Sequence, residues 1–276
     1  MPDLKAHSLL ATEAVAVFDV LCSGKHRPPD TEECTMTTRF VFPYRGIYVH
    51  HVGRTDSVAE SNRVVFINAD EPFRVSHPLE GGDATLSISL SAPTLLETVP
   101  TELQRRGSLP AVNRSSLRVE AQVQVLAATL RHRLVRGAVT VLEAEAMTLA
   151  LIRRAVGHHP TTSARITTRS RRLVENTKVV LAADLERRRG LSEIAREVGV
   201  SPVYLTQVFQ RVEGVPLYRY QLQQRLARSL HLLGQYDDVT DMAHALGFSS
   251  HSHFSARFKQ AYGQTPSDFR RLSHLR

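Results

Sequence analysis

The chain has 276 residues, of which 42% are hydrophobic and 22% are charged, values typical of globular domains rather than of disordered chains. This length is sufficient for two domains of ordinary size, and no apolar run reaches the roughly 18 residues of a membrane-spanning helix. Two cysteines, Cys22 and Cys34, are too few for a disulfide framework or a four-cysteine zinc site. The first twenty residues lack the pattern of a signal peptide, so we expect a cytoplasmic protein.

Positive charge is confined to the C-terminal part of the chain. Up to residue 164, Lys plus Arg and Asp plus Glu are equal in number, at 17 each, whereas the remainder has 18 of the former and 10 of the latter. The entire net charge of +8 therefore lies after residue 164. This distribution indicates a polyanionic partner for the C-terminal part alone, with a basic surface that has no target as the alternative.

The first predicted elements are short strands between residues 35 and 91. They are rich in β-branched and aromatic residues, and proline and glycine separate them. The segments are TMTTRFVF (35–42), GIYVHHV (46–52), NRVVFINA (62–69), FRVSH (73–77) and ATLSISLS (84–91). Strands of this length and spacing predict a small β-barrel or sandwich.

Helical periodicity replaces the strand pattern from about residue 115 to residue 156. Apolar residues recur three and four positions apart on both sides of Arg136 and Gly137, which predicts two helices joined as a hairpin. The apolar stripe could pack on the barrel or on a second copy of the chain. We therefore expect a domain of strands and a helical hairpin over 1–156, a linker without apolar periodicity over 157–168, and an all-helical domain over 169–276.

The helical part contains an internal repeat. The segment LSEIAREVGVSPVYLTQVFQ (191–210) aligns with VTDMAHALGFSSHSHFSARFK (239–259), and Gly199 and Gly247 are 48 residues apart. In each copy an alanine precedes the glycine by four residues, a serine follows the glycine, and an apolar ladder follows the serine. Two copies at matching offsets are a much stronger signal than one, because single patterns of this kind occur in many helical hairpins.

Each copy has the parts of a helix-turn-helix motif. The alanine lets a second helix cross closely, the glycine can adopt the left-handed conformation that ends the first helix, and Ser201 or Ser250 can cap the second helix. A connecting helix over 215–235 would place two such recognition helices about one duplex turn apart on DNA. Its leucines are expected to face both copies: Leu222, Leu226, Leu230 and Leu233.

The C-terminal part resembles the DNA-binding domain of the AraC/XylS family of transcription regulators. The stretch from Leu246 to Arg270 carries the most diagnostic residues, including GF, FS, FK, Gly263 and TPSDFR, and the resemblance covers about 174–271. The preceding part is similar, less specifically, to the cupin-like domain and dimerisation hairpin of that family. The resemblance implies an α+β protein with an N-terminal cupin-like β-barrel and helical hairpin, and a C-terminal all-α domain with two helix-turn-helix motifs.

The resemblance also implies which residues contact DNA. Expected positions on the two recognition helices are Val203, Tyr204, Thr206 and Gln207, and His251, Ser252, Ser255 and Ala256. Many family members have arginine where this chain has Gln207 and Ala256. Glutamine suits adenine, and alanine can offer only a methyl contact to thymine. Phosphate contacts are expected from Ser201, Arg211, Ser250, Arg257 and Lys259. For each polar residue the alternative is a solvated helix face.

The predicted barrel is the expected site of a small-molecule effector. Candidate effector-binding residues are His50, Tyr48, Phe66 and Phe73. Adjacent strand residues point to opposite faces, so we expect one of His50 and His51 in the core or pocket and the other at the surface.

The sequence predicts no metal site, cofactor or catalytic residue. Cys22, His26 and Cys34 do not complete a zinc site, and buried or idle cysteines are favoured over a metal or thiol sensor. His251 and His253 are two positions apart on a predicted helix and do not face each other. The chain also lacks a Gly-rich phosphate loop, a nucleophile elbow and a pair of catalytic carboxylates.

The leading hypothesis is a sequence-specific DNA-binding regulator, dimeric through the hairpin and located at the bacterial nucleoid. Its expected partners are double-stranded promoter or operator DNA, a small-molecule effector, RNA polymerase and a second copy of the chain, but no membrane. One alternative is a cupin-type enzyme with a DNA- or polyanion-binding tail. Another is an interaction protein whose basic helices bind a different polyanion, which a steep salt dependence without sequence preference would indicate.

Overall fold

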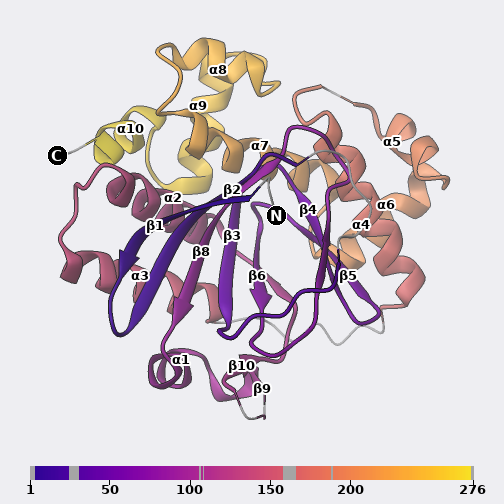
Figure 1. Cartoon of the computed structure of the whole chain (residues 1–276). Helices are drawn as coiled ribbons and strands as arrows, with labels where there is room; N and C mark the ends of the chain where they lie inside the picture. The colour runs from indigo at the N-terminus through magenta and orange to yellow at the C-terminus, as the bar shows by residue number, and fades with distance from the viewer. Residues whose placement is uncertain are drawn as a thin grey trace.

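The computed structural model describes residues 4–24, 31–105, 107, 109–157, 166–187 and 189–274. We refer to 4–157 as the N-terminal region and to 166–274 as the C-terminal region. The N-terminal region combines antiparallel sheets with a helical hairpin, and the C-terminal region is helical (Figure 1). The expected α+β class is therefore confirmed.

A six-stranded antiparallel sheet forms most of the N-terminal region. In spatial order its strands are β1 (Leu4–Ala11), β2 (Val15–Cys22), β8 (Asp83–Leu90), β3 (Arg39–Arg45), β6 (Arg63–Ile67) and β11 (Ser116–Arg118). One face carries the main core, where the rings of Phe40 and Phe66 meet edge to face at 5.5 Å. The aromatic and β-branched residues of these strands form a sheet because one face is buried continuously.

A smaller sheet and a two-stranded ribbon complete the β-structure. The smaller sheet contains β5 (Thr55–Ala59), β4 (Tyr48–Val52) and β7 (Arg74–Ser76), and the ribbon pairs β9 (Gln104–Arg105) with β10 (Ala111–Val112). Within the described residues, β4, β5 and β7 pair only with one another, and β1 and β11 are the edges of the larger sheet. Within the described residues the sheets do not close into a barrel, because hydrogen bonding does not continue around the structure; the two separate sheets correspond to the sandwich alternative of the expectation.

The five predicted strand segments correspond to β3, β4, β6, β7 and β8. The strands β1, β2, β5, β9, β10 and β11 were not predicted. Residues 116–118 were expected to begin a helix, but they pair with residues 63–65 at the edge of the sheet. Pairing with β6 overrides the local helical spacing there, because edge pairing satisfies backbone groups that a helix end would leave open.

The predicted hairpin is present, and it packs on its own sheet. It consists of α2 (Ala121–Val135) and α3 (Val141–Val156), which turn at Gly137, and it follows α1 (Ala92–Thr98) and a 3₁₀ turn (Thr101–Leu103). Val123 and Leu130 of α2 share the main core with the sheet. On another side of α2, Ala121, Val125 and Ala128 pack against a core of the C-terminal region.

The C-terminal region contains seven helices within its described residues, and none of the described helices has the length and hydropathy needed to cross a bilayer. The helices are α4 (Thr168–Ala183), α5 (Leu191–Glu197), α6 (Pro202–Glu213), α7 (Leu217–Leu232), α8 (Val239–Ala245), α9 (His251–Tyr262) and α10 (Pro266–His274). Figure 1 shows α4 to α6 on one side of the molecule and α8 to α10 on the other, with α7 between them. Of the predicted linker, residues 158–165 lie outside the described part of the chain.

Each helix-turn-helix has its own core, and α7 contributes to both. Leu217 and Tyr220, at the start of α7, pack with the first motif. The four leucines expected to face both motifs instead pack with the second: Leu222, Leu226, Leu230 and Leu233. That expectation was wrong because a 16-residue helix extends about 24 Å, so that its first turns meet one motif and its later turns meet the other.

Candidate nucleic-acid interface

The two turn motifs share one backbone geometry. Gly199 and Gly247 have φ of +72° and +76°, the left-handed conformation that ends a helix. Ser201 then accepts a hydrogen bond from the backbone N–H of Tyr204 at 3.2 Å, and Ser250 accepts one from that of His253 at 3.1 Å. The predicted turns and caps are therefore confirmed, and the sequence repeat is a structural repeat.

Close packing behind each turn explains the small residues of the repeat. Ala195 and Ala243 are fully buried where the two helices of a motif cross. The two glycines differ in their surroundings. A Cβ on Gly247 would lie 2.1 Å from the carbonyl oxygen of Glu186, whereas a Cβ on Gly199 would meet nothing within 4 Å. The second turn therefore packs against the segment that follows α4, and the first turn does not.

The exposed face of α6 carries the residues expected to contact DNA. Val203 is 66% exposed and Tyr204 is 42% exposed, although both have large hydrophobic side chains. Gln207 and Arg211 continue this face. The hydroxyl of Thr206 donates to the carbonyl oxygen of Val203 at 2.8 Å, so it can only accept from a ligand. The opposite face is buried in the first core.

The exposed face of α9 is more polar than that of α6. The expected residues His251, Ser252, Ala256, Arg257 and Lys259 are exposed, and Ser255 is half-buried with its Oγ 3.3 Å from Nε2 of His251. Phe254 and Phe258 anchor the opposite face in the second core. All expected positions on both helices therefore lie on surfaces that a duplex could reach.

Two arginines outside these faces hold the motifs in place. The Arg225 guanidinium on α7 donates to the carbonyl oxygens of Leu185 at 2.8 Å, Arg187 at 2.9 Å and Gly247 at 3.3 Å. It thereby joins the segment after α4 to the turn of the second motif. Sequence reasoning missed Arg225, because its partners are carbonyl oxygens about 20 and 40 residues away, which no side-chain pattern reveals.

Arg270 closes the second motif in a similar way. Its guanidinium donates to the carbonyl oxygens of Leu233 and Tyr236 at 2.9 Å each, and so connects α10 to the end of α7. The TPSDFR run of the sequence ends at this arginine, so that part of the run stabilises the fold rather than facing DNA.

A cluster of buried charges joins the N-terminal region to the first motif. We call Glu60, Arg63, Glu175, Lys178 and Glu213 the buried charge cluster. Nζ of Lys178 lies 2.8 Å from Oε1 of Glu175 and 2.7 Å from Oε1 of Glu213. A guanidinium nitrogen of Arg63 lies 2.8 Å from the same Glu213 oxygen, and the backbone N–H of Val58 donates to Glu175 at 2.6 Å. Strands β5 and β6 therefore contact both α4 and the end of α6.

The cluster has three carboxyl groups but two cations, and its pKa values reflect that imbalance. Burial opposes ionisation of Glu213, but Arg63 and Lys178 outweigh it and lower the pKa of Glu213 to about 2. Burial raises the pKa of Glu60 to about 7, although Lys178 and Arg63 act in the opposite direction. Glu213 is therefore the ionised partner of the two cations, and Glu60 is the group that gains a proton most easily.

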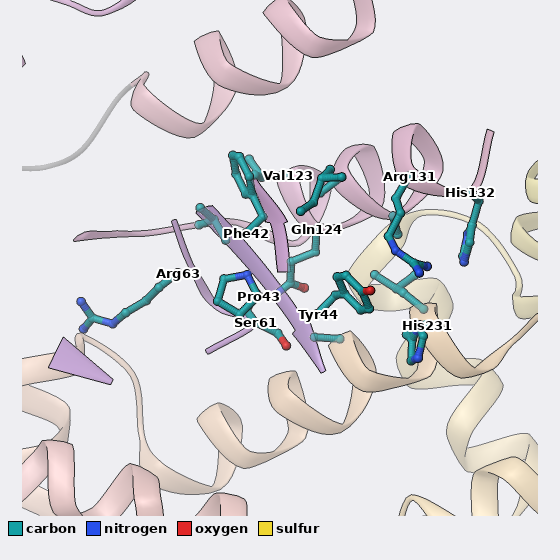
Figure 2. Close-up of a pocket in the computed structure, with 16 residues that line it drawn as sticks. Phe42, Pro43, Tyr44, Ser61, Arg63, Val123, Gln124, Arg131, His132 and His231 are labelled. Atoms are coloured by element: carbon teal, nitrogen blue, oxygen red, sulfur yellow. Dashed lines mark hydrogen bonds between the residues drawn. The ribbon is translucent and has the colours of Figure 1, made fainter. Parts of the chain in front are cut away.

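A second contact between the regions forms where β2, β3, α2 and α7 meet. Figure 2 shows Tyr44 of β3 with Arg131 of α2 and His231 of α7 beside it. The guanidinium of Arg131 lies 4.1 Å from the centre of the Tyr44 ring. The centres of the Tyr44 and His231 rings are 5.0 Å apart. Asp19 of β2 accepts from both Tyr44, at 2.7 Å, and Arg131, at 2.8 Å. Burial, reinforced by Arg131, lowers the pKa of His231 to about 3, so its ring is neutral at physiological pH.

Tyr44, Arg131 and His231 line a cavity of about 40 Å³, which we call the junction cavity. This volume has room for roughly two or three water molecules. An organic effector of ordinary size does not fit there without rearrangement.

A larger cavity of about 150 Å³, which we call the sheet cavity, lies between the two sheets. Of the residues expected to bind an effector, Tyr48 and Phe73 line it. His50 is buried against Phe73, with ring centres 5.5 Å apart. Phe66 lies on the opposite face of its strand, in the main core, because its neighbour Ile67 is the residue that faces the cavity. The expected place of Phe66 is therefore corrected.

The adjacent histidines point in opposite directions, as strand alternation predicts. His50 is buried, and neither ring nitrogen has a hydrogen-bond partner among the described residues. Burial lowers the pKa of His50 to about 4, so its ring is neutral at physiological pH. His51 lies nearer the surface, with Nδ1 2.8 Å from Asp56 and Nε2 2.7 Å from Ser76.

The two cysteines, expected to be buried or idle, occupy different surroundings. Cys22 and Cys34 are not joined by a disulfide, and Cys34 is exposed. His26, which was weighed with them as a possible zinc ligand and not favoured, lies outside the described residues. The structure instead places Cys22 near His77 and Asp83, a combination that the sequence did not suggest.

Two capped turns joined by one connecting helix define a double helix-turn-helix domain. Residues 194–272 match a family model described as a helix-turn-helix domain. The C-terminal region therefore belongs to the AraC-type helix-turn-helix domains, as its resemblance implied.

Relatives with known names match the same part of the chain. Over 90 residues the chain is 37% identical to the HTH-type transcriptional regulator GlxA of Rhizobium meliloti (strain 1021). This match covers 32% of this chain and 28% of that protein. Over 82 residues the chain is 32% identical to the Msm operon regulatory protein of Streptococcus mutans. This match covers 29% of this chain and 30% of that protein. The crystal structure of a transcriptional regulator from Chromobacterium violaceum is 28% identical, with a TM-score of 0.37, and covers 39% of this chain and 97% of that one.

The chain spans about a third or less of the length of the curated relatives it matches, between 27% and 33%. These sequence similarities therefore concern the helix-turn-helix domain and leave the N-terminal region to be interpreted from its own structure.

Proposed function

We propose that this protein is a sequence-specific DNA-binding transcription regulator of the AraC type. The observation that carries the proposal is the pair of turn motifs with matching caps, whose second helices, α6 and α9, expose the face opposite their cores. In helix-turn-helix proteins, helices exposed in this way enter the major groove of DNA. Two such helices in one domain can bind major-groove sites about one helical turn apart. The net charge of +8, all of it after residue 164, supports a polyanionic partner.

The two helices are proposed to read bases in different ways. Gln207 on α6 can form a bidentate pair with adenine, and Val203 can contact a thymine methyl group. On α9, His251 and Ser252 offer hydrogen bonds, and Ala256 offers at most a methyl contact. Arg211, Arg257 and Lys259 are proposed to bind phosphates, together with the caps at Ser201 and Ser250.

The N-terminal region is proposed to act as the regulatory input, with a small ligand in the sheet cavity. The support for this role is the direct contact between β6 and the end of α6 through Arg63 and Glu213. A ligand that favours one arrangement of the sheets would change the position of α6 only if it binds that arrangement more tightly than the other.

Dimerisation and contact with RNA polymerase belong to the same proposal. The hairpin buries one side on its own sheet, but Val135, Val141 and Leu142 near its tip are exposed large hydrophobic residues. A second copy of the chain could cover them. Such a regulator would act in the cytoplasm, at the nucleoid. Light scattering of the full chain and of Leu142→Glu tests the dimer: an equal monomer mass for both would contradict it.

The test of DNA recognition is selection from random-sequence duplex DNA at moderate salt with the purified full chain. We expect two enriched blocks separated by about one helical turn, roughly 10 base pairs. Repeating the selection with Gln207→Ala should relax one block only. Gln235→Ala, the same change at an exposed residue after α7, serves as the matched control and should leave both blocks intact. If nothing is enriched, with or without cell extract, the proposal is contradicted.

A further inference from the structure

Three side chains of the types that bind transition metals meet at one end of the larger sheet. Cys22 and Asp83 are opposite partners at the ends of β2 and β8, and His77 lies six residues before Asp83. The thiol sulfur, an imidazole nitrogen and a carboxylate oxygen of these residues all lie within 4.8 Å of one another. Nε2 of His77 is 2.9 Å from Oδ2 of Asp83. His77 and Asp83 are only 7% and 5% exposed.

Three glycines bring the segments that carry these residues into contact. A Cβ on Gly82, where φ is +69°, would lie 2.1 Å from the carbonyl oxygen of Cys22. A Cβ on Gly46, where φ is +66°, would lie 2.2 Å from the carbonyl oxygen of Gly82. A Cβ on Gly24 would be 3.1 Å from the ring of His77. Because no other residue fits at Gly82 or Gly46, the backbone holds the three side chains together before any ion binds.

The spacing of the ligand atoms is close to that of a zinc site. Nitrogen, oxygen and sulfur ligands lie about 2.0–2.3 Å from zinc, so that neighbouring ligand atoms in a tetrahedron are roughly 3.3–3.6 Å apart. The distance of 2.9 Å between Nε2 of His77 and Oδ2 of Asp83 is slightly shorter than this ligand spacing. The largest separation allowed among the three ligand atoms, 4.8 Å, is longer than it. Side-chain shifts of about 1 Å would therefore be sufficient to admit an ion.

The chemistry of the three ligands selects among metals. Magnesium and calcium prefer oxygen ligands alone, whereas a thiolate and an imidazole together favour zinc and its spectroscopic substitute cobalt. The three side chains also line the sheet cavity. A site with three protein ligands next to a cavity keeps one coordination position for water or a small ligand.

We propose that Cys22, His77 and Asp83 bind one divalent transition-metal ion of zinc-like chemistry, with its fourth position open to the sheet cavity. Binding displaces the thiol proton of Cys22 to solvent, since the thiolate is the ligand. The proposal goes beyond the proposed function, because an ion can bind here whether or not the C-terminal region binds DNA. It also departs from the sequence-based expectation of a metal-free protein, which compared Cys22 only with His26 and Cys34.

The test uses the purified full chain, stripped of metal with a chelator and titrated with Co²⁺ and then with competing Zn²⁺. We expect one equivalent of Co²⁺ to bind and to produce the near-ultraviolet absorption of a thiolate–cobalt bond. Cys22→Ser should abolish that absorption, and Asp83→Asn should lower the affinity for Co²⁺ by at least about tenfold. Cys34→Ser, the same change at the exposed cysteine, should leave both unchanged.

Circular dichroism and native mass spectrometry of each variant separate loss of a ligand from loss of the fold. A folded wild-type protein that takes up no Co²⁺ or Zn²⁺ would overturn the inference, as would an unchanged thiolate–cobalt absorption in Cys22→Ser. DNA retention measured on the same samples keeps the two proposals apart. Normal DNA binding without metal uptake overturns this inference alone, and metal uptake without DNA binding, in the presence and in the absence of cell extract, overturns the proposed function alone.

Discussion

Arg63 of β6 holds Glu213, the last residue of α6, through a contact of 2.8 Å between a guanidinium nitrogen and Oε1. Their side chains are 17% and 2% exposed, so the pair is largely shielded from water and from salt. Arg118 of β11 donates to the backbone carbonyl oxygen of the same glutamate at 2.6 Å. Strands β6 and β11 of the N-terminal region therefore both contact the C-terminal end of α6, a proposed recognition helix.

Breaking this pair from one side should be costly. Arg63→Met leaves Glu213 buried, with Lys178 as the one remaining ion-pair partner of its carboxylate and Arg118 as a more distant cation, and we expect a loss of about 3–5 kcal/mol in the free energy of unfolding. Glu213→Gln should also destabilise the protein. The double variant should lose clearly less than the sum of the two, because each single change leaves a charge without its partner.

Urea denaturation followed by circular dichroism measures these losses. Arg271→Met is the control, because its pair with Asp268 lies at the surface, and it should change stability by no more than about 0.5 kcal/mol. Strict additivity of Arg63→Met and Glu213→Gln would show that the two side chains do not interact energetically.

Glu60 should make the stability of the protein depend on pH. Burial raises its pKa from 4.5 to about 7, so the folded protein holds the proton more tightly than the unfolded chain. The contribution of Glu60 to stability is therefore complete below about pH 4.5 and is lost as the pH rises through about 7. Glu60→Gln should remove this pH-dependent contribution. The Tm of the variant minus the Tm of the wild type should therefore increase as the pH rises from about 4.5 to about 7.

Thermal unfolding of both proteins in a series of buffers measures this difference in Tm. Glu97→Gln, a change at an exposed glutamate, should leave the pH profile of the wild type unaltered. A constant difference between Glu60→Gln and the wild type over the whole interval would mean that Glu60 titrates normally in the folded protein.

The two turn glycines should respond differently to the same substitution. Gly199→Ala places alanine in a left-handed conformation with free space around it, which costs about 1–2 kcal/mol. Gly247→Ala has the same strain and also forces a Cβ to within 2.1 Å of the carbonyl oxygen of Glu186. We expect Gly247→Ala to be the more destabilising change in chemical denaturation. Equal losses would mean that the segment after α4 moves away at no cost.

The proposed base and phosphate contacts can be separated by their salt dependence. Gln207→Ala should weaken binding to the selected DNA site by about 1–3 kcal/mol and reduce discrimination at one base pair. Arg211→Ala should weaken binding to all sequences alike and lower the slope of log K against log salt by about 1. Fluorescence anisotropy with matched and mismatched duplexes at several salt concentrations distinguishes them. Identical behaviour of the two variants would contradict the assigned roles.

The sequence was sufficient for the helix-turn-helix motifs, because their signals are local. A left-handed glycine, a serine cap and an apolar ladder are each set within about ten residues, as Gly199 and Ser201 illustrate. The strands β1 and β2 were missed, although Val15, Val17 and Asp19 of β2 are buried in strict alternation with their neighbours. The sequence does not show that alternation, because Ala16, Phe18 and Val20 on the other side are also apolar and the one charged residue, Asp19, is on the buried side.

The remaining differences are non-local. Cys22 and Asp83 meet because β2 pairs with β8, and nothing in the intervening sequence specifies that pairing. Phe66 and Tyr48 were grouped by residue type, but strand alternation and the order of the strands place them on different faces of the N-terminal region. The contact between Arg63 and Glu213 spans 150 residues and depends on how the two regions pack.

The helix α2 belongs to two cores at once, with Val123 and Leu130 in one and Ala121, Val125 and Ala128 against the other. The hydroxyl of Tyr262 on α9 also donates to Gln124 of α2 at 3.1 Å. The C-terminal region is therefore not an interchangeable module. In a chimera that joins the C-terminal region to a foreign sensor at residue 166, the second motif would lose its apolar contacts with α2. An engineered fusion therefore needs to retain α2 to keep that apolar surface out of contact with water.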